Sequence, residues 1–167
     1  MVDGVPAAPD CALCRGPDGD PGLSRVEVWR DDLWRFSMAT QGPTLGFGYL
    51  EPIRHIPFLA DLDGPEAATF GPVIAHVSAV LREVTDAPQV YAYVFGSGIP
   101  HLHVHLAPNT PVGVLSTQLI EGQVEVRPLP SGAGEIVSLD HPDLPEAELA
   151  QVIDRVRVAL EFGASDR

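Results

Sequence analysis

Residues 100–106 read Pro100-His101-Leu102-His103-Val104-His105-Leu106, and they hold half of the six histidines in the chain. Histidines and aliphatic residues alternate here with a period of two, which is the side-chain period of a β-strand. In such a strand the three imidazoles project from one face, and the aliphatic residues between them face the core. A row of imidazoles builds a poor apolar core, so the pattern indicates a site that handles phosphate or a metal ion.

Geometry disfavours a catalytic zinc ion held by all three histidines. Residues i and i+4 of a strand lie about 13 Å apart, so His101 and His105 cannot share one ion without other segments. A neutral imidazole can instead attack phosphorus when one ring nitrogen is fixed by a hydrogen bond and the other is free. The central ring, His103, is best placed for such an attack.

The turn Gly96-Ser97-Gly98 comes directly before the histidines and is a candidate phosphate-binding segment. Glycine allows backbone N–H groups to approach a phosphate closely, and Ser97 adds a hydroxyl. The alternative is that the Ser97 hydroxyl only stabilises the turn.

Cys11 and Cys14 form a C-x-x-C pair that is followed by a loop rich in glycine and proline. A redox motif would require the start of a helix after the pair, so a metal-binding knuckle is favoured. Tetrahedral zinc takes four sulfur or nitrogen donors, and His55 and one histidine of residues 101–105 could complete the set. Two inert thiols are the alternative. His76 and His141 have no potential ligands near them in the sequence, and we expect neither to bind metal.

The length of 167 residues and a hydrophobic content of 45% fit one compact core. The net charge of −13 opposes broad binding to nucleic acid or to an anionic membrane surface. Neither an apolar stretch of membrane-spanning length nor the pattern of a secretory signal is present, so we expect a cytoplasmic protein.

Hydrophobic periodicity and turn residues predict one α+β domain. Strands are expected at 25–30, 33–38, 44–51, 90–95 and the histidine stretch, with a hairpin of 124–127 and 135–138 and helices starting near Asp63 and Asp143. We expect flexible tails at 1–10 and 163–167 around a single domain at 11–162. Within that domain, 11–108 form the core and 109–162 add the hairpin and the last helix.

Three segments together resemble the histidine-triad superfamily of nucleotide hydrolases, which more distantly includes galactose-1-phosphate uridylyltransferase. Residues 101–106 are similar to its His-φ-His-φ-His-φ-φ motif. Residues 46–55, Gly-Phe-Gly-Tyr-Leu-Glu-Pro-Ile-Arg-His, are similar to Gly-His-x-Leu-Val-Ile-Pro-Lys-x-His. The C-x-x-C pair resembles the zinc knuckle of many members, so the resemblance spans about residues 11–108. It implies a bent antiparallel sheet of about five strands with two main helices.

The resemblance also implies a role for each site residue. His103 would be the nucleophile and would form a covalent phosphohistidine, and His101 would orient its ring through a backbone carbonyl. His105 would contact phosphate or the leaving group, together with Ser97 and Gly98. A structural Zn²⁺ would be held by Cys11, Cys14, His55 and His101.

Two departures from the family pattern bear on the substrate. Ala39 stands where family hydrolases carry an acidic residue that binds the ribose hydroxyls, and Phe47 replaces a common histidine. These changes leave the phosphoryl-transfer residues intact and weaken the expectation of an ordinary adenosine pocket.

The leading functional hypothesis is a nucleotidyl hydrolase acting on a nucleoside 5′-phosphate ester, anhydride or phosphoramidate. Alternatives are a nucleotidyltransferase that uses a sugar phosphate or other acceptor, and a non-catalytic zinc-stabilised protein that binds a phosphorylated metabolite. The expected partner is a nucleotide or another phosphorylated small molecule, not nucleic acid or a membrane. The resemblance implies a homodimer.

Overall fold

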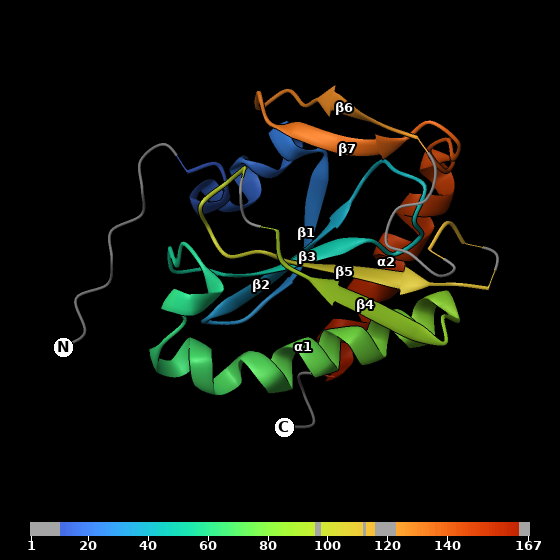
Figure 1. Cartoon of the computed structure of the whole chain (residues 1–167). Helices are drawn as coiled ribbons and strands as arrows, with labels where there is room; N and C mark the ends of the chain where they lie inside the picture. Colours follow the sequence, from blue (N-terminus) through green and yellow to red (C-terminus); the bar gives the residue numbers. More distant parts are fainter. Residues whose placement is uncertain (1–10, 96–97, 112, 116–122, 164–167) are drawn as a thin grey trace.

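A five-stranded antiparallel sheet forms the centre of the computed structural model, which describes residues 11–95, 98–111, 113–115 and 123–163 (Figure 1). Its strand order is β1-β2-β3-β5-β4. The strands are β1 (Arg25–Arg30), β2 (Trp34–Ala39), β3 (Gly48–Pro52), β4 (Gln89–Tyr93) and β5 (Val104–Asn109). A separate two-stranded sheet pairs β6 (Val124–Pro128) with β7 (Gly134–Ser138).

Within the described residues, two long helices and three short 3-10 helices complete the fold. The long helix α1 (Gly64–Thr85) connects β3 to β4, and α2 (Glu146–Gly163) follows β7. The 3-10 helices are η1 (Leu13–Asp18), η2 (Asp20–Leu23) and η3 (Leu59–Asp61). The α+β fold with about five sheet strands and two main helices is therefore confirmed.

Both long helices cover the same, apolar face of the five-stranded sheet. Along β2, Trp34, Phe36 and Met38 alternate with polar residues and are no more than 1% exposed. Against them pack Val77 and Leu81 of α1 and Val156 and Leu160 of α2, all fully buried. This is the expected alternation for a sheet with one buried apolar face.

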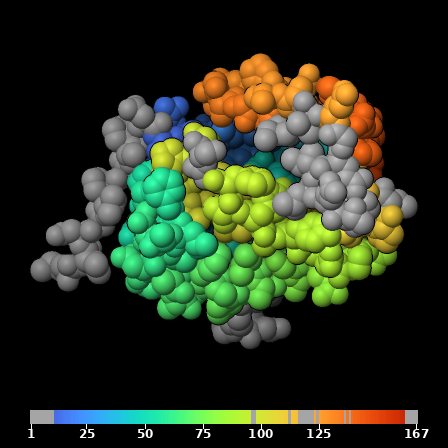
Figure 2. Space-filling view, viewed as in Figure 1, coloured from blue at the N-terminus to red at the C-terminus, as the bar shows by residue number. Residues whose placement is uncertain are grey.

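The β6–β7 hairpin lies over the opposite face of the sheet, above the strands in Figure 1. Gln41 Nε2 donates to Glu135 Oε2 at 2.9 Å, and the Ser131 backbone N–H donates to Gly22 O at 2.9 Å. Figure 2 shows a recessed surface between this hairpin, in orange, and the yellow-green β4 region. The polar face of the sheet is thus partly roofed, while its apolar face is closed by helices.

Three of the predicted strands have different bounds in the structure. β3 begins at Gly48 because residues 40–46 form bends and a turn, with Gly46 at a φ of +79° that favours glycine. A Cβ at Gly48 would lie 2.7 Å from Ser37 O and closer still to the Phe36 ring, which explains glycine there. β4 ends at Tyr93 instead of residue 95, and the histidine strand begins only at Val104.

The carboxylates expected near the starts of the helices make other contacts. Asp63 does occupy the N-cap position of α1, but its side chain makes no capping bond and accepts from Arg54 at 2.5 Å. Asp143 pairs with Arg127 at 2.6 Å. Each carboxylate is used to tie its helix start to another segment.

Some predictions fall on residues outside the described ranges, namely the tail at 1–10, Gly96 and Ser97 of the candidate phosphate segment, and most of the tail at 163–167. Among the described residues, no helix combines the length and the apolar character needed to cross a bilayer.

Candidate zinc centre and histidine site

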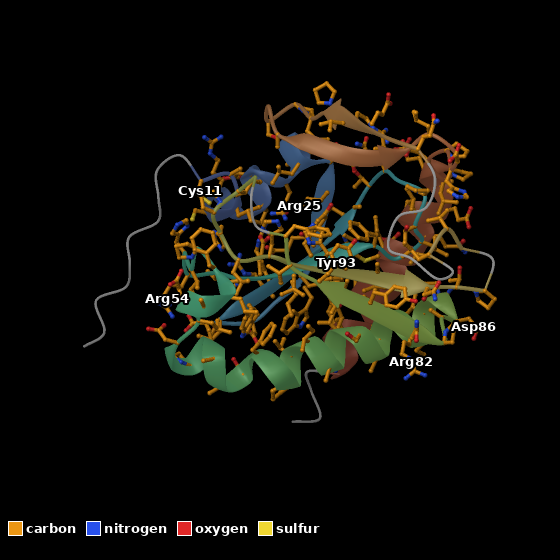
Figure 3. The ribbon with its side chains drawn as sticks, viewed as in Figure 1. Cys11, Arg25, Arg54, Arg82, Asp86 and Tyr93 are labelled. Carbon is orange, nitrogen blue, oxygen red and sulfur yellow. The ribbon has the colours of Figure 1, made fainter. Side chains whose placement is uncertain are left out.

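Four potential metal donors converge from three distant parts of the chain. Cys11 and Cys14 come from η1 and the residues just before it, His55 follows β3, and His101 precedes β5. Cys11 Sγ lies 3.4 Å and Cys14 Sγ 3.4 Å from His101 Nδ1, and Cys14 Sγ lies 3.2 Å from His55 Nδ1. All four donor atoms lie within 4.8 Å of one another, and no disulfide joins the two cysteines. Cys11 is labelled in Figure 3.

The spacing of these donors fits zinc. With Zn–S near 2.3 Å and Zn–N near 2.0–2.1 Å, a tetrahedral S···N edge is about 3.5 Å. The three sulfur–nitrogen distances given above are close to that edge. Four protein donors fill a tetrahedral zinc ion, so this is a structural site rather than a catalytic one with an open position.

The hydrogen bond from the other ring nitrogen of His101 fixes its tautomer for metal binding. His101 is 1% exposed, and its Nε2–H donates to the Pro52 carbonyl at 2.9 Å. Nδ1 therefore carries the lone pair that faces the two sulfurs. Burial also lowers the pKa of His101, which favours the neutral ring that metal ligation requires.

His103 is oriented by the same residue. Its Nδ1–H donates to the backbone carbonyl of His101 at 2.6 Å, so Nε2 holds a lone pair. The half-buried His103 ring does not belong to the group of four metal donors. This is the arrangement that a nucleophilic imidazole needs, with one nitrogen fixed and the other open.

His105 lies beside His103, with ring centroids 5.1 Å apart, and is surrounded by aromatic side chains. The Tyr93 ring stacks on it at 4.8 Å, and Phe47, Tyr49 and Phe95 lie within 6 Å of it. Its Nδ1–H donates to the Tyr93 carbonyl at 3.3 Å. Burial, with a smaller contribution from His103, lowers the pKa of His105 to about 4, so the ring is neutral near pH 7.

The three histidines do not all lie within one strand, so that part of the expectation is wrong. Only His105 lies within β5, and the His101 ring turns toward the cysteines. The aliphatic half of the pattern is confirmed, since Leu102, Val104 and Leu106 are no more than 2% exposed. Alternation correctly predicted the buried residues, whereas the zinc donors determine where the first ring points.

Gly98 of the candidate phosphate segment borders a cavity of about 500 Å³ beside the zinc centre. Pro100, the zinc donors Cys11 and His55, and Ser131 of the β6–β7 turn also line it. Gly98 is exposed, and Ser97 lies outside the described residues. The extra hairpin thus reaches the segment that precedes the histidines.

A buried ionic cluster that joins η2 to β1, β2 and β3 was not predicted from the sequence. We name it the Asp20–Glu51 cluster; its members are Asp20, Arg25, Glu27, Arg35 and Glu51. Arg25, which is labelled in Figure 3, donates from Nε to Asp20 at 2.9 Å and from both terminal nitrogens to Glu51 at 3.0 Å. Burial alone would lower the pKa of Arg35, but Glu51 and Asp20 together raise it above its ordinary value.

Comparison with known proteins points to one group of structures. No family model matches the sequence, and no curated protein is significantly similar to it. A hypothetical histidine triad nucleotide-binding protein from Sulfolobus tokodaii superposes with a TM-score of 0.63 at 16% identity, covering 91% of this chain and 93% of that one. A Zn-bound histidine triad family protein from Mycobacterium smegmatis gives 0.62 at 16% identity, covering 94% and 97%. A histidine triad protein from Bradyrhizobium japonicum gives 0.62 at 17% identity, covering 82% and 91%.

These similarities agree with the histidine motif at residues 101–106. They cover most of each chain at 16–17% identity, and similarity at this level establishes the fold and not the activity. The zinc centre is inferred from the geometry of its four donors. The resemblance read from residues 11–108 is thereby confirmed at the level of the fold. This chain has the fold of the histidine-triad proteins.

Proposed function

We propose that the protein is a nucleotidyl hydrolase of the histidine-triad superfamily, with His103 as its nucleophile. The observation that carries the proposal is the His103 ring, whose Nδ1–H is held by the His101 carbonyl at 2.6 Å and which lies outside the group of four metal donors among the described residues. The substrates are nucleoside 5′-phosphate esters, anhydrides or phosphoramidates. The Sulfolobus neighbour is described as nucleotide-binding, which supports this class.

In the first step, His103 Nε2 attacks the phosphorus atom and forms a P–N bond. The bond from phosphorus to the leaving oxygen or nitrogen breaks, and the leaving group takes up a proton from solvent. In the second step, water attacks phosphorus and gives one proton back to solvent, the P–N bond breaks with its electron pair returning to His103 Nε2, and the nucleotide is released. A covalent intermediate divides one difficult displacement into two easier ones.

His105 is positioned to assist at the phosphoryl group. Because Nδ1–H is committed to the Tyr93 carbonyl, Nε2 is the nitrogen left for substrate. An anionic phosphoryl group beside Nε2 favours its protonation, which would make it a hydrogen-bond donor to a phosphoryl oxygen. Gly98 and Ser97 are the proposed backbone and hydroxyl contacts to the same group.

Zinc has a structural part in this scheme. When bound, it clamps η1 to His55 and His101, and no step of the reaction passes through it. The Pro52 carbonyl holds the His101 ring by a hydrogen bond, and the His101 carbonyl in turn sets the orientation of the His103 ring.

Turnover of a panel of dinucleoside polyphosphates and nucleoside phosphoramidates tests the proposal. We expect at least one of these compounds to be hydrolysed. We expect His103→Ala to lower turnover by a factor of about 10³ or more while zinc stays bound. His141→Ala, a histidine outside the site, is the matched control and should keep full activity. Turnover that requires a sugar phosphate acceptor would favour the transferase, and binding without turnover would favour the non-catalytic alternative.

A further inference from the structure

The Asp20–Glu51 cluster links the chain segments that carry the two halves of the zinc centre. One half is the thiol pair on and before η1, and η2, which carries Asp20, follows it directly. The other half is the imidazole pair near the end of β3, where Glu51 precedes Pro52. Arg25 and Arg35 each contact both Asp20 and Glu51, so they link the two halves.

The link continues to His101 through one residue of backbone. Glu51 is 0% exposed, and its carboxylate accepts from Arg25 and Arg35. The next carbonyl, that of Pro52, accepts the Nε2–H of His101 at 2.9 Å. Any shift of Glu51 therefore displaces the acceptor that holds the tautomer and orientation of a zinc ligand.

Stability alone explains the cluster poorly. Asp20, Arg25, Arg35 and Glu51 are each 5% exposed or less, and desolvating such charges offsets most of their mutual attraction. A small apolar cluster already packs the knuckle, with Leu13 and Leu23 buried against Ile99. Ion pairs differ from apolar contacts because they are directional: each guanidinium holds several carboxylate oxygens at defined angles.

We propose that the Asp20–Glu51 cluster positions the zinc centre, with Asp20 and Glu51 as its positioning residues. It sets the placement of the thiol half relative to the imidazole half, and it holds the Pro52 carbonyl against His101. The effect on zinc affinity stands whether or not the protein is a hydrolase. The accompanying effect on turnover, through the His101 carbonyl and His103, rests on the proposed function.

Zinc affinity of Glu51→Gln, measured on the full chain by competition with a chromophoric chelator, tests the proposal. Glutamine keeps the shape of the side chain but offers one acceptor oxygen instead of two charged ones. We expect zinc to bind about 10- to 100-fold more weakly, as is typical when a hydrogen-bonding partner of a ligand is lost. In zinc-saturating buffer, kcat should fall while KM changes little.

Two control variants separate positioning from general loss of stability. Val156→Ala removes buried volume from α2, on the other face of the sheet, and Asp143→Asn removes a carboxylate from the partly exposed pair with Arg127. Both should bind zinc within twofold of the unsubstituted protein. Asp20→Asn is the second test variant. It keeps an acceptor oxygen for Arg25, and we expect it to bind zinc more weakly, as Glu51→Gln does.

Unchanged zinc affinity in both Glu51→Gln and Asp20→Asn would overturn the proposal, as would an equal loss of affinity in Val156→Ala. Failure of both cluster variants to fold in the presence of zinc would assign the cluster to folding and would also overturn it. Weakened zinc binding in a protein that hydrolyses no substrate would instead leave this inference intact and refute only the proposed function.

Discussion

At the scale of single residues, the aromatic surroundings of His105 matter most for its protonation. The ring is half-buried, and the Tyr93, Tyr49, Phe47 and Phe95 rings around it offer no charged partner. Burial therefore disfavours the imidazolium form and lowers the pKa of His105 from 6.5 to about 4. The unfolded chain binds a proton in that interval that the folded chain does not.

The free energy of unfolding should consequently depend on this residue between pH 6.5 and 4. The contribution is complete above pH 6.5 and is lost as the pH falls toward 4, by at most about 3 kcal/mol. Denaturant titrations of the unsubstituted protein and of His105→Phe, which suits the aromatic surroundings, measure it as the difference between two pH profiles. Zinc affects both proteins alike, so parallel profiles would contradict the assignment.

The residues that could be predicted are those with a recognisable donor type and spacing. Cys11, Cys14 and His55 stood out because thiols and imidazoles are few in this chain, whereas the choice of His101 as the fourth ligand came from the resemblance to the histidine-triad proteins. The charged residues of the Asp20–Glu51 cluster did not, because arginine and glutamate in alternating strands usually face solvent. The charged residues at 25, 27, 35 and 51 can be recognised as one cluster only when the order of the strands in the sheet is known.

At the scale of elements, zinc connects η1 to two segments that no sheet hydrogen bond joins to it. η1 is short and contains Pro17, so its stability depends on the zinc ligands and on a small apolar cluster. Removing the metal leaves two thiols and two imidazoles without their common partner, and metal binding energy is folding energy for such a segment. The core below the sheet has no such dependence.

We therefore predict a local effect of zinc removal on hydrogen exchange. Chelation should reduce amide protection at residues 11–24 and 99–103, while α1 and α2 keep theirs. Mass spectrometry of peptides from the zinc-bound and chelated proteins measures this. Cys14→Ser is the control, because chelator should change nothing further in it. Uniform loss of protection over the whole chain would be the contrary result.

Element boundaries show where sequence patterns reach their limit. Apolar alternation over residues 101–106 predicted a continuous strand, and the buried residues agree with it. The strand nevertheless begins at Val104, because Leu102 N–H donates to Ile56 O and the His101 ring reaches the cysteines. Those partners are distant in sequence, so no local pattern contains them.

At the scale of the whole molecule, the sheet separates a core that confers stability from a face that carries the site. Val156 and Val158 lie two residues apart on α2, one fully buried against the sheet side and one 50% exposed. None of the contacts described above joins a zinc ligand or a triad histidine to Val156 or Val158. Stability and site chemistry should thus be separable by substitution on this helix.

Val156→Ala should lower the free energy of unfolding by roughly 2–3 kcal/mol, and Val158→Ala by no more than about 0.5 kcal/mol. Both should retain zinc and turnover at temperatures where they are folded. Denaturant unfolding measures the first statement, and zinc content and kcat measure the second. Equal destabilisation by the two substitutions would contradict the packing of α2.

The central claim is that His103 Nε2 forms a bond to phosphorus. Intact-protein mass spectrometry of samples quenched at alkaline pH during turnover of a nucleoside phosphoramidate tests it most directly, because phosphohistidine survives base. The account predicts an added mass of one nucleotidyl group that maps to His103 and is absent from His103→Ala but present in His141→Ala. Continued turnover with no adduct, or an adduct on another residue, would contradict it.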